Sequence, residues 1–191
     1  MFFFFLCGIS SFLLYFLFDY LEYRSIHFRG GKLLGYLSVI LLVISVIGLI
    51  ISSPKWQVPL ILRIFSAIFS IPVLFFFLRS LFFEVSFYKD ENENFVRTGS
   101  YKLCRHPGVL LLFLLLFFIS LATGSSYLFY GAFLFSFLNL FITIFEDKVF
   151  LPYKFKEYED YRRKVPFLFP KLSDIFEIIK NDLCNNFRRS R

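Results

Sequence analysis

The sequence predicts an all-α integral membrane protein, a bundle of about five transmembrane helices, and three observations support this. Hydrophobic residues make up 58% of the 191 positions and charged residues only 18%, whereas an average soluble domain carries about 25% charged residues. The mean hydropathy is +0.68, and 32 residues are phenylalanine, more than one soluble core of this length buries. The apolar residues also form long runs, as expected where each helix crosses a bilayer core with about 20 apolar residues.

Five apolar runs are the expected membrane spans. They cover residues 2–18, 33–53, 58–83, 108–123 and 127–145. The first run ends at Asp19 and lacks the basic start and the small-residue cleavage site of a signal peptide, so we expect a retained helix. Arg63 lies near one end of the third run, where a long basic side chain is expected to reach the membrane interface. Only Gly124, Ser125 and Ser126 separate the last two runs, which predicts a tight antiparallel helical hairpin.

The polar segments divide the chain into three predicted parts. Residues 1–83 form three transmembrane helices, and residues 84–171 form a polar loop, the transmembrane hairpin and a charged segment with several prolines. Residues 172–191 form a basic tail. Ile175, Ile178, Ile179 and Leu183 recur there at helical spacing, so we expect an amphipathic helix on the membrane surface.

The basic residues predict the orientation of the chain. The net charge is +7, and lysine and arginine are plentiful in the first and third loops and in the tail but scarce in the second and fourth loops. The residues after position 146 alone supply 11 of the 21. Because positive residues favour the cytoplasmic side, we expect five spans with the C-terminus in the cytoplasm, in the plasma or inner membrane of a bacterium or the endoplasmic reticulum of a eukaryote. This distribution indicates contact with anionic membrane lipids and no binding of nucleic acid.

Polar side chains are predicted to gather at the open end of the hairpin. The triplet Arg105-His106-Pro107 precedes its first helix, and Glu146-Asp147 follows its second. Both helices are long enough to cross most of the bilayer, so the two groups return to the same face. One interpretation is a functional site, since polar groups held together at that depth are costly. The other is an interfacial salt bridge between Arg105 and Glu146 that locks the hairpin, with nearby tyrosines as an aromatic belt.

Three motifs in this half of the chain carry a family resemblance. The segment Gly99-Ser100-Tyr101-Lys102-Leu103-Cys104-Arg105-His106-Pro107 resembles the G-x-Y-x-x-x-R-H-P signature of the isoprenylcysteine carboxyl methyltransferase and phospholipid methyltransferase superfamily. Glu146-Asp147 resembles the family's E-E pair. The stretch from Phe155 to Pro166, closing with Pro170, resembles its F-G-x-x-Y-x-x-Y-x-x-x-V-P…P ending. The resemblance covers roughly residues 90–171.

The resemblance implies a membrane enzyme that transfers a methyl group from S-adenosylmethionine to a lipid-soluble acceptor. It implies that Arg105 and His106 act in catalysis, with His106 as a general base or as a hydrogen-bond donor to the cofactor. It implies that Glu146 holds the polar end of the cofactor and that Arg105 pairs with the cofactor carboxylate or with Glu146. The implied cofactor-binding residues are Phe95, Val96, Tyr101, His106, Pro107, Gly108, Val109, Glu146 and Asp147.

Several positions depart from the family pattern and keep two alternatives open. Val109 and Leu111 replace the usual tyrosine and small residue after the proline, and Ile142 stands where prenylcysteine methyltransferases carry an arginine associated with the acceptor. A prenylcysteine acceptor is therefore not expected, whereas the cofactor half of the pattern is largely intact. The alternatives are a non-catalytic membrane scaffold with the same fold and a relative of the NADPH-dependent sterol-type reductases.

Overall fold

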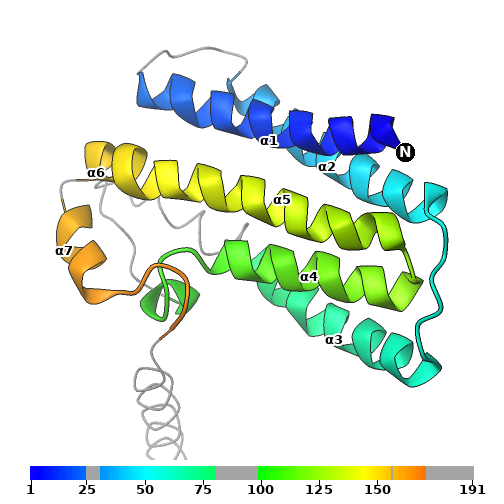
Figure 1. The fold of residues 1–191 in the computed structure, drawn as a ribbon. Coiled ribbons are helices and arrows are strands. Elements are labelled where there is room, and N and C mark those ends of the chain that lie inside the picture. The colour runs from blue at the N-terminus through cyan, green and yellow to red at the C-terminus, as the bar shows by residue number, and fades with distance from the viewer. Residues whose placement is uncertain (25–30, 81–98, 156, 171–191) are drawn as a thin grey trace, which may run out of the picture.

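The computed structural model describes residues 1–24, 31–80, 99–155 and 157–170, and within these ranges the regular structure is helical (Figure 1). The long helices are α1 (Phe2–Tyr23), α2 (Gly31–Ser52), α3 (Leu60–Leu78), α4 (Pro107–Thr123) and α5 (Ser126–Phe145). The short ones are η3 (Gly99–Lys102), η4 (Glu146–Phe150), α6 (Leu151–Lys154) and α7 (Tyr158–Lys164). The first three helices, and α5 with its continuation to Lys154, are long and apolar enough to cross a membrane. Helix α4 is equally apolar in character but has 17 residues.

The predicted all-α membrane bundle is thus confirmed, and one predicted helix end is wrong. Helix α1 continues past residue 18 through Asp19 to Tyr23. Asp19 lies inside this helix, and its side chain is buried, at 4% exposure, near Glu146 at the C-terminal end of α5. The basic tail and the amphipathic helix predicted there lie outside the described residues, as do Phe95 and Val96.

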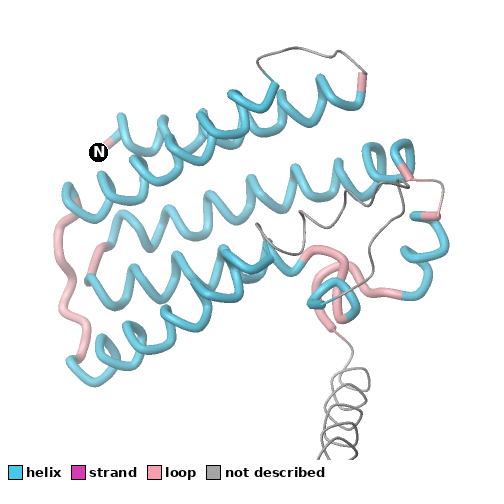
Figure 2. The backbone as a smooth tube through the Cα atoms, turned by 180° about the vertical axis from the view of Figure 1, so that it is seen from behind, coloured by secondary structure: helices cyan, strands magenta, loops and turns pink. Residues whose placement is uncertain are grey.

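Four of the five long helices form two antiparallel pairs, α1–α2 and α3–α4, and α5 joins the two pairs. Helices α1 and α2 are held by two hydrogen bonds, from Ser11 Oγ to the Ser38 carbonyl and from Ser45 Oγ to the Phe4 carbonyl, both at 2.7 Å. Helix α3 lies against α4, and α5 lies between α4 and the α1–α2 pair (Figures 1 and 2). Such hydroxyl-to-carbonyl bonds tie helices together where lipid offers no hydrophobic driving force.

The turn of the predicted hairpin is built by two consecutive residues. Gly124 ends α4 in the left-handed conformation (φ 64°), which a residue without a Cβ adopts at little cost. Ser125 then caps α5, because its Oγ accepts a hydrogen bond from the Leu128 N–H at 3.1 Å. Helices α4 and α5 therefore run antiparallel side by side, with Phe113 opposite Phe133 at 5.4 Å between ring centroids.

The core lies where α1, α2, α4 and α5 meet around Phe135, whose side chain is fully buried. Gly8 makes this possible, because a Cβ there would lie 2.2 Å from the Phe135 ring. The outer faces of α2 and α3 instead expose large apolar side chains, such as Ile51 on α2 and Ile61 on α3, which a bilayer would cover. Ile142 also belongs to the core, with 4% exposure.

Arg63 lies at the opposite end of the bundle from the open end of the hairpin. Its Nε donates to the carbonyl of Ala122, in the last turn of α4, at 3.2 Å. The side chain is exposed, and the carbonyl it binds is one of those left without a partner at a helix end. A structural role at the end of α4 accounts for this arginine, and its place at the membrane interface stays a prediction.

The C-terminal end of α1, the N-terminal end of α4 and the C-terminal end of α5 share one end of the bundle, together with η3, η4, α6 and α7 (Figure 1). Segments that are far apart in the sequence, near Tyr23, Pro107 and Phe145, therefore meet there, and this end holds the candidate site.

Candidate functional site

The N-terminus of α4 is held in place by the segment that follows α7. Pro107 occupies the first turn of α4, where its missing N–H costs nothing. The N–H of Arg105 donates to the Pro166 carbonyl at 2.9 Å, and the N–H of His106 donates to the Phe167 carbonyl at 3.2 Å. The Phe167 ring lies edge-on to the His106 ring at 5.2 Å between centroids and below the Arg105 guanidinium at 5.4 Å. Two of the three sequence motifs are thus in direct contact.

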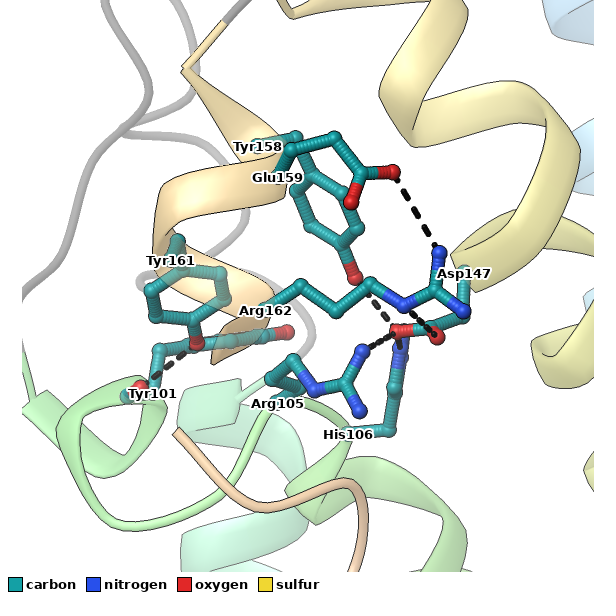
Figure 3. Close-up of polar contacts among 8 residues, drawn as sticks. All are labelled: Tyr101, Arg105, His106, Asp147, Tyr158, Glu159, Tyr161 and Arg162. Atoms are coloured by element: carbon teal, nitrogen blue, oxygen red, sulfur yellow. Dashed lines mark hydrogen bonds and ion pairs between the residues drawn. The ribbon is translucent and has the colours of Figure 1, made fainter. Parts of the chain in front are cut away.

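Asp147 joins the third motif to the other two (Figure 3). Its Oδ1 accepts hydrogen bonds from Arg105 Nη1 and, at 2.6 Å, from the Tyr158 hydroxyl. The same oxygen lies 3.1 Å from His106 Nε2 and pairs with it. The Asp147 side chain is 5% exposed, and those of Arg105 and His106 are 10% and 9% exposed. A buried carboxylate is stable only when charged and hydrogen-bonding partners surround it, and this one has both.

A second arginine extends the cluster toward the surface. Arg162 Nε lies 3.6 Å from Asp147 Oδ2, and Arg162 Nη1 lies 3.3 Å from Glu159 Oε1 (Figure 3). Arg162 is about one-third exposed, so water screens its interactions more than those of Arg105. The Nε–H of Arg105 is buried and has no hydrogen-bond partner among the described residues, so one donor of the cluster is not satisfied by the chain itself.

Two buried tyrosines on α7 complete the packing of this region. Tyr161 donates to the Tyr101 carbonyl at 2.6 Å, which ties α7 to η3. Burial, followed by the hydrogen bond to Asp147 and its charge, raises the pKa of Tyr158 well above its usual value. Burial likewise raises the pKa of Tyr161, so both hydroxyls stay protonated and act as donors.

Cys104 lies directly before the arginine, and it is 4% exposed. Burial raises the pKa of its thiol to about 11, partly offset by a hydrogen bond with the backbone of His106. A neutral, buried thiol is a poor nucleophile, so Cys104 serves as a packing residue here.

Glu146 points away from this cluster, because consecutive helical residues are about 100° apart. Its Oε1 accepts a hydrogen bond from the Tyr15 hydroxyl of α1 at 3.2 Å, and its carboxyl lies within hydrogen-bonding reach of Asp19. The turn that carries Glu146 and Asp147 is η4, a π-helix, a form found mostly as single turns and often at functional sites. The carboxylate beside His106 is therefore Asp147, and Arg105 pairs with Asp147 rather than with Glu146.

The other residues singled out in the sequence lie around the same end. Val109 and Pro107 are buried in the first turn of α4, and Tyr101 is half-buried in η3. Gly108 has open space beside it, since a Cβ there would meet only Ser80 Oγ at 3.9 Å. Sequence reasoning missed Asp19 and Tyr15, because an acid next to an apolar run was taken to end the helix. The signal available was that Tyr15 and Asp19 are four residues apart and so share one face of a helix.

No family model, curated protein or solved structure matches this chain at a significant level.

Proposed function

We propose that the chain is an integral membrane methyltransferase that uses S-adenosylmethionine and acts on a lipophilic or amphiphilic acceptor. One observation carries the proposal: the three segments that resemble the methyltransferase motifs, far apart in sequence, contact one another at a single end of the bundle. The hairpin alone brings residues 105–107 and 146–147 to one end, but it does not require the later segment at Pro166 and Phe167 to return to the start of α4, as it does.

The residues present suit the charges of the cofactor. S-adenosylmethionine carries a carboxylate, an ammonium and a sulfonium group, and it supplies an activated methyl group when bound. The Nε–H of Arg105, for which the described residues provide no acceptor, offers a buried donor for a carboxylate oxygen. The half-buried Glu146 offers a carboxylate for a cation, in surroundings where charge–charge attraction exceeds that in water.

The chain's own contribution to such a reaction is alignment and charge placement. Asp147 orients the His106 ring by binding Nε2, and it holds the Arg105 guanidinium against the start of α4. If Nε2 carries the proton, Nδ1 is the nitrogen that accepts one, which suits a general base for an amine acceptor. Alignment of donor and acceptor supplies most of what an activated methyl group needs.

The orientation of the chain belongs to the proposal as well. Because the cofactor is dissolved in the cytosol, the end with Arg105 and Asp147 faces the cytoplasm, in agreement with the distribution of basic residues. The acceptor reaches the site from the membrane lipid. A reporter fused after Arg191 tests this, and we expect it to be active only on the cytoplasmic side.

Titration of the detergent-purified protein with S-adenosylhomocysteine tests the function. We expect saturable binding, its loss in Glu146→Ala, and its retention in the control Glu159→Ala, which removes a carboxylate on the exposed face of α7. Binding of NADPH in place of S-adenosylhomocysteine would instead support a reductase. If neither ligand binds, the methyltransferase proposal is wrong.

A non-catalytic scaffold is the second candidate, and one feature favours it. Asp147 is fully engaged by Arg105, His106 and Tyr158, as in a purely structural lock between α4, α5 and α7. A scaffold of this kind needs these contacts for stability and binds neither S-adenosylhomocysteine nor NADPH. The same titration therefore separates the two candidates.

A further inference from the structure

A second polar site lies on the other side of η4, between α1 and the end of α5. Asp19 and Glu146 are brought together there across 127 residues of sequence, and the Tyr15 hydroxyl donates to Glu146 Oε1 at 3.2 Å. Asp19 is 4% exposed, and its Oδ2 has no hydrogen-bond partner within the described part of the chain. Two facing carboxyls with an unsatisfied, buried oxygen have no structural reason to be stable by themselves.

The basic side chains that the structure describes near this pair are bound to other carboxylates. Lys154 on α6 lies near enough to act on Asp19, but its ammonium is bound to Glu22 at 2.7 Å. The guanidinium of Arg105 is bound to Asp147. Within the described part of the chain, the site therefore has a net negative charge unless a proton or an external cation occupies it, and a buried charged carboxylate is costly.

One aromatic side chain contacts the pair directly, because the Tyr15 hydroxyl binds Glu146, and Tyr15 lies on the exposed side of α1. Next to it, Phe16 on α1 lies edge-on to Phe145 at the end of α5, at 5.0 Å between ring centroids. Carboxylates combined with aromatic side chains are the chemistry that recognises alkylammonium groups, whereas small inorganic cations prefer more oxygen ligands than the described residues offer here.

We propose that Asp19 and Glu146 form a binding site for an alkylammonium group, approached from the half-buried side of Glu146. Two sources share that chemistry: the ammonium of the cofactor's amino-acid end and the amine headgroup of an amphiphilic acceptor. The identification of these two sources depends on the proposed function, whereas the existence of a cation site depends only on the two carboxyls. Asp19 is the residue that the methyl-transfer motifs do not include, so its substitution isolates this inference.

The experiment compares three probes on the wild type and on Asp19→Asn, a change that keeps the shape of the side chain. S-adenosylhomocysteine carries the ammonium, 5′-methylthioadenosine lacks it, and radiolabelled dodecylammonium represents an amine amphiphile. If the cofactor is the source, Asp19→Asn weakens S-adenosylhomocysteine binding about 10- to 100-fold and leaves methylthioadenosine unchanged. If the acceptor is the source, both nucleosides bind as before and dodecylammonium binding falls by a similar factor.

The control is Glu22→Gln, which removes a carboxyl of the same helix that is 43% exposed and already paired with Lys154. We expect it to change none of the three affinities by more than about twofold. The inference is wrong if Asp19→Asn also leaves all three affinities unchanged. It is equally wrong if the wild type binds no dodecylammonium and its affinities for the two nucleosides do not depend on Asp19. In either case the two carboxyls hold only a shared proton. If the wild type binds dodecylammonium in an Asp19-dependent manner but neither nucleoside, the inference stands and the methyltransferase proposal fails.

Discussion

The hydroxyl of Tyr158 donates to Oδ1 of Asp147 at 2.6 Å, and both side chains are almost fully buried. This bond connects α7 to the end of α5, while the same oxygen accepts from Arg105 at the start of α4. One carboxylate oxygen thus unites the three segments that carry the family resemblance. Substitutions that remove a single hydroxyl or carboxylate oxygen therefore test how these contacts stabilise the candidate site.

Removing the hydroxyl in Tyr158→Phe is expected to lower the free energy of unfolding by about 1.5–3 kcal/mol, because a buried carboxylate loses a hydrogen bond. The measurement is a titration with sodium dodecyl sulfate that follows helix content. Tyr153→Phe is the matched control, since Tyr153 is 64% exposed, and it is expected to change stability by less than about 0.5 kcal/mol. Equal effects of the two variants would contradict the assignment.

The two neighbouring carboxyls of η4 are expected to respond in opposite ways. Asp147→Asn breaks a buried ion pair and leaves the Arg105 charge without its partner, which costs about 3–5 kcal/mol. Glu146→Gln removes one of two facing carboxyls, so it is expected to leave stability unchanged or to raise it. The same unfolding titration measures both. A larger loss for Glu146→Gln than for Asp147→Asn would show that the two side chains have exchanged roles.

Two glycine-to-alanine substitutions test the hairpin turn. At Gly124 the positive φ and a Cβ only 3.2 Å from the Trp56 carbonyl are expected to cost about 1–2 kcal/mol. At Gly35, inside α2, a Cβ meets nothing within 4 Å, and alanine is expected to stabilise the helix by up to about 1 kcal/mol. Thermal unfolding in one detergent compares the pair. Destabilisation by both to the same extent would mean that helix packing, not the turn, is responsible.

The thiol of Cys104 is expected to resist alkylation. Burial raises its pKa from 9.0 to about 11, so at pH 8 the reactive thiolate is about 100-fold scarcer than for an exposed cysteine. In a background of Cys7→Ser and Cys184→Ser, the rate of maleimide labelling should rise about tenfold for each pH unit up to pH 11. Labelling that is rapid at pH 8 and independent of pH would contradict the burial of this residue. Full reactivity after unfolding in sodium dodecyl sulfate is the control.

Much of the architecture follows from local pattern. The apolar runs predicted the helices, with α2, α4 and α5 beginning and ending within about two residues of expectation, since a helix in lipid needs an uninterrupted apolar stretch. Gly124 and Ser125 predicted the turn between α4 and α5, because a left-handed cap and an N-cap are properties of a few neighbouring residues. The meeting of Arg105 and His106 with the segment at 146–147 also followed, because two antiparallel spans of similar length must return to one face.

The identity of the partners did not follow from pattern. Glu146 and Asp147 are adjacent and chemically alike, and which of them contacts His106 depends on the rotation of α5 about its axis and on the π-turn of η4. That rotation is set by packing of Phe135 and Ile142 against helices elsewhere in the chain. For the same reason Asp19, on a helix more than 100 residues away, could not be assigned to Glu146 in advance.

The sequence alone determined that this chain lies in a membrane as a helical bundle with a polar cluster at one end of a hairpin, because hydrophobicity and turn chemistry act over short distances. Only the tertiary structure decided that Asp147 faces Arg105, His106 and Tyr158 while Glu146 faces Asp19 and Tyr15. The physical reason is that neighbouring residues of a helix point in different directions. The helices that happen to pack against each side decide what each residue meets.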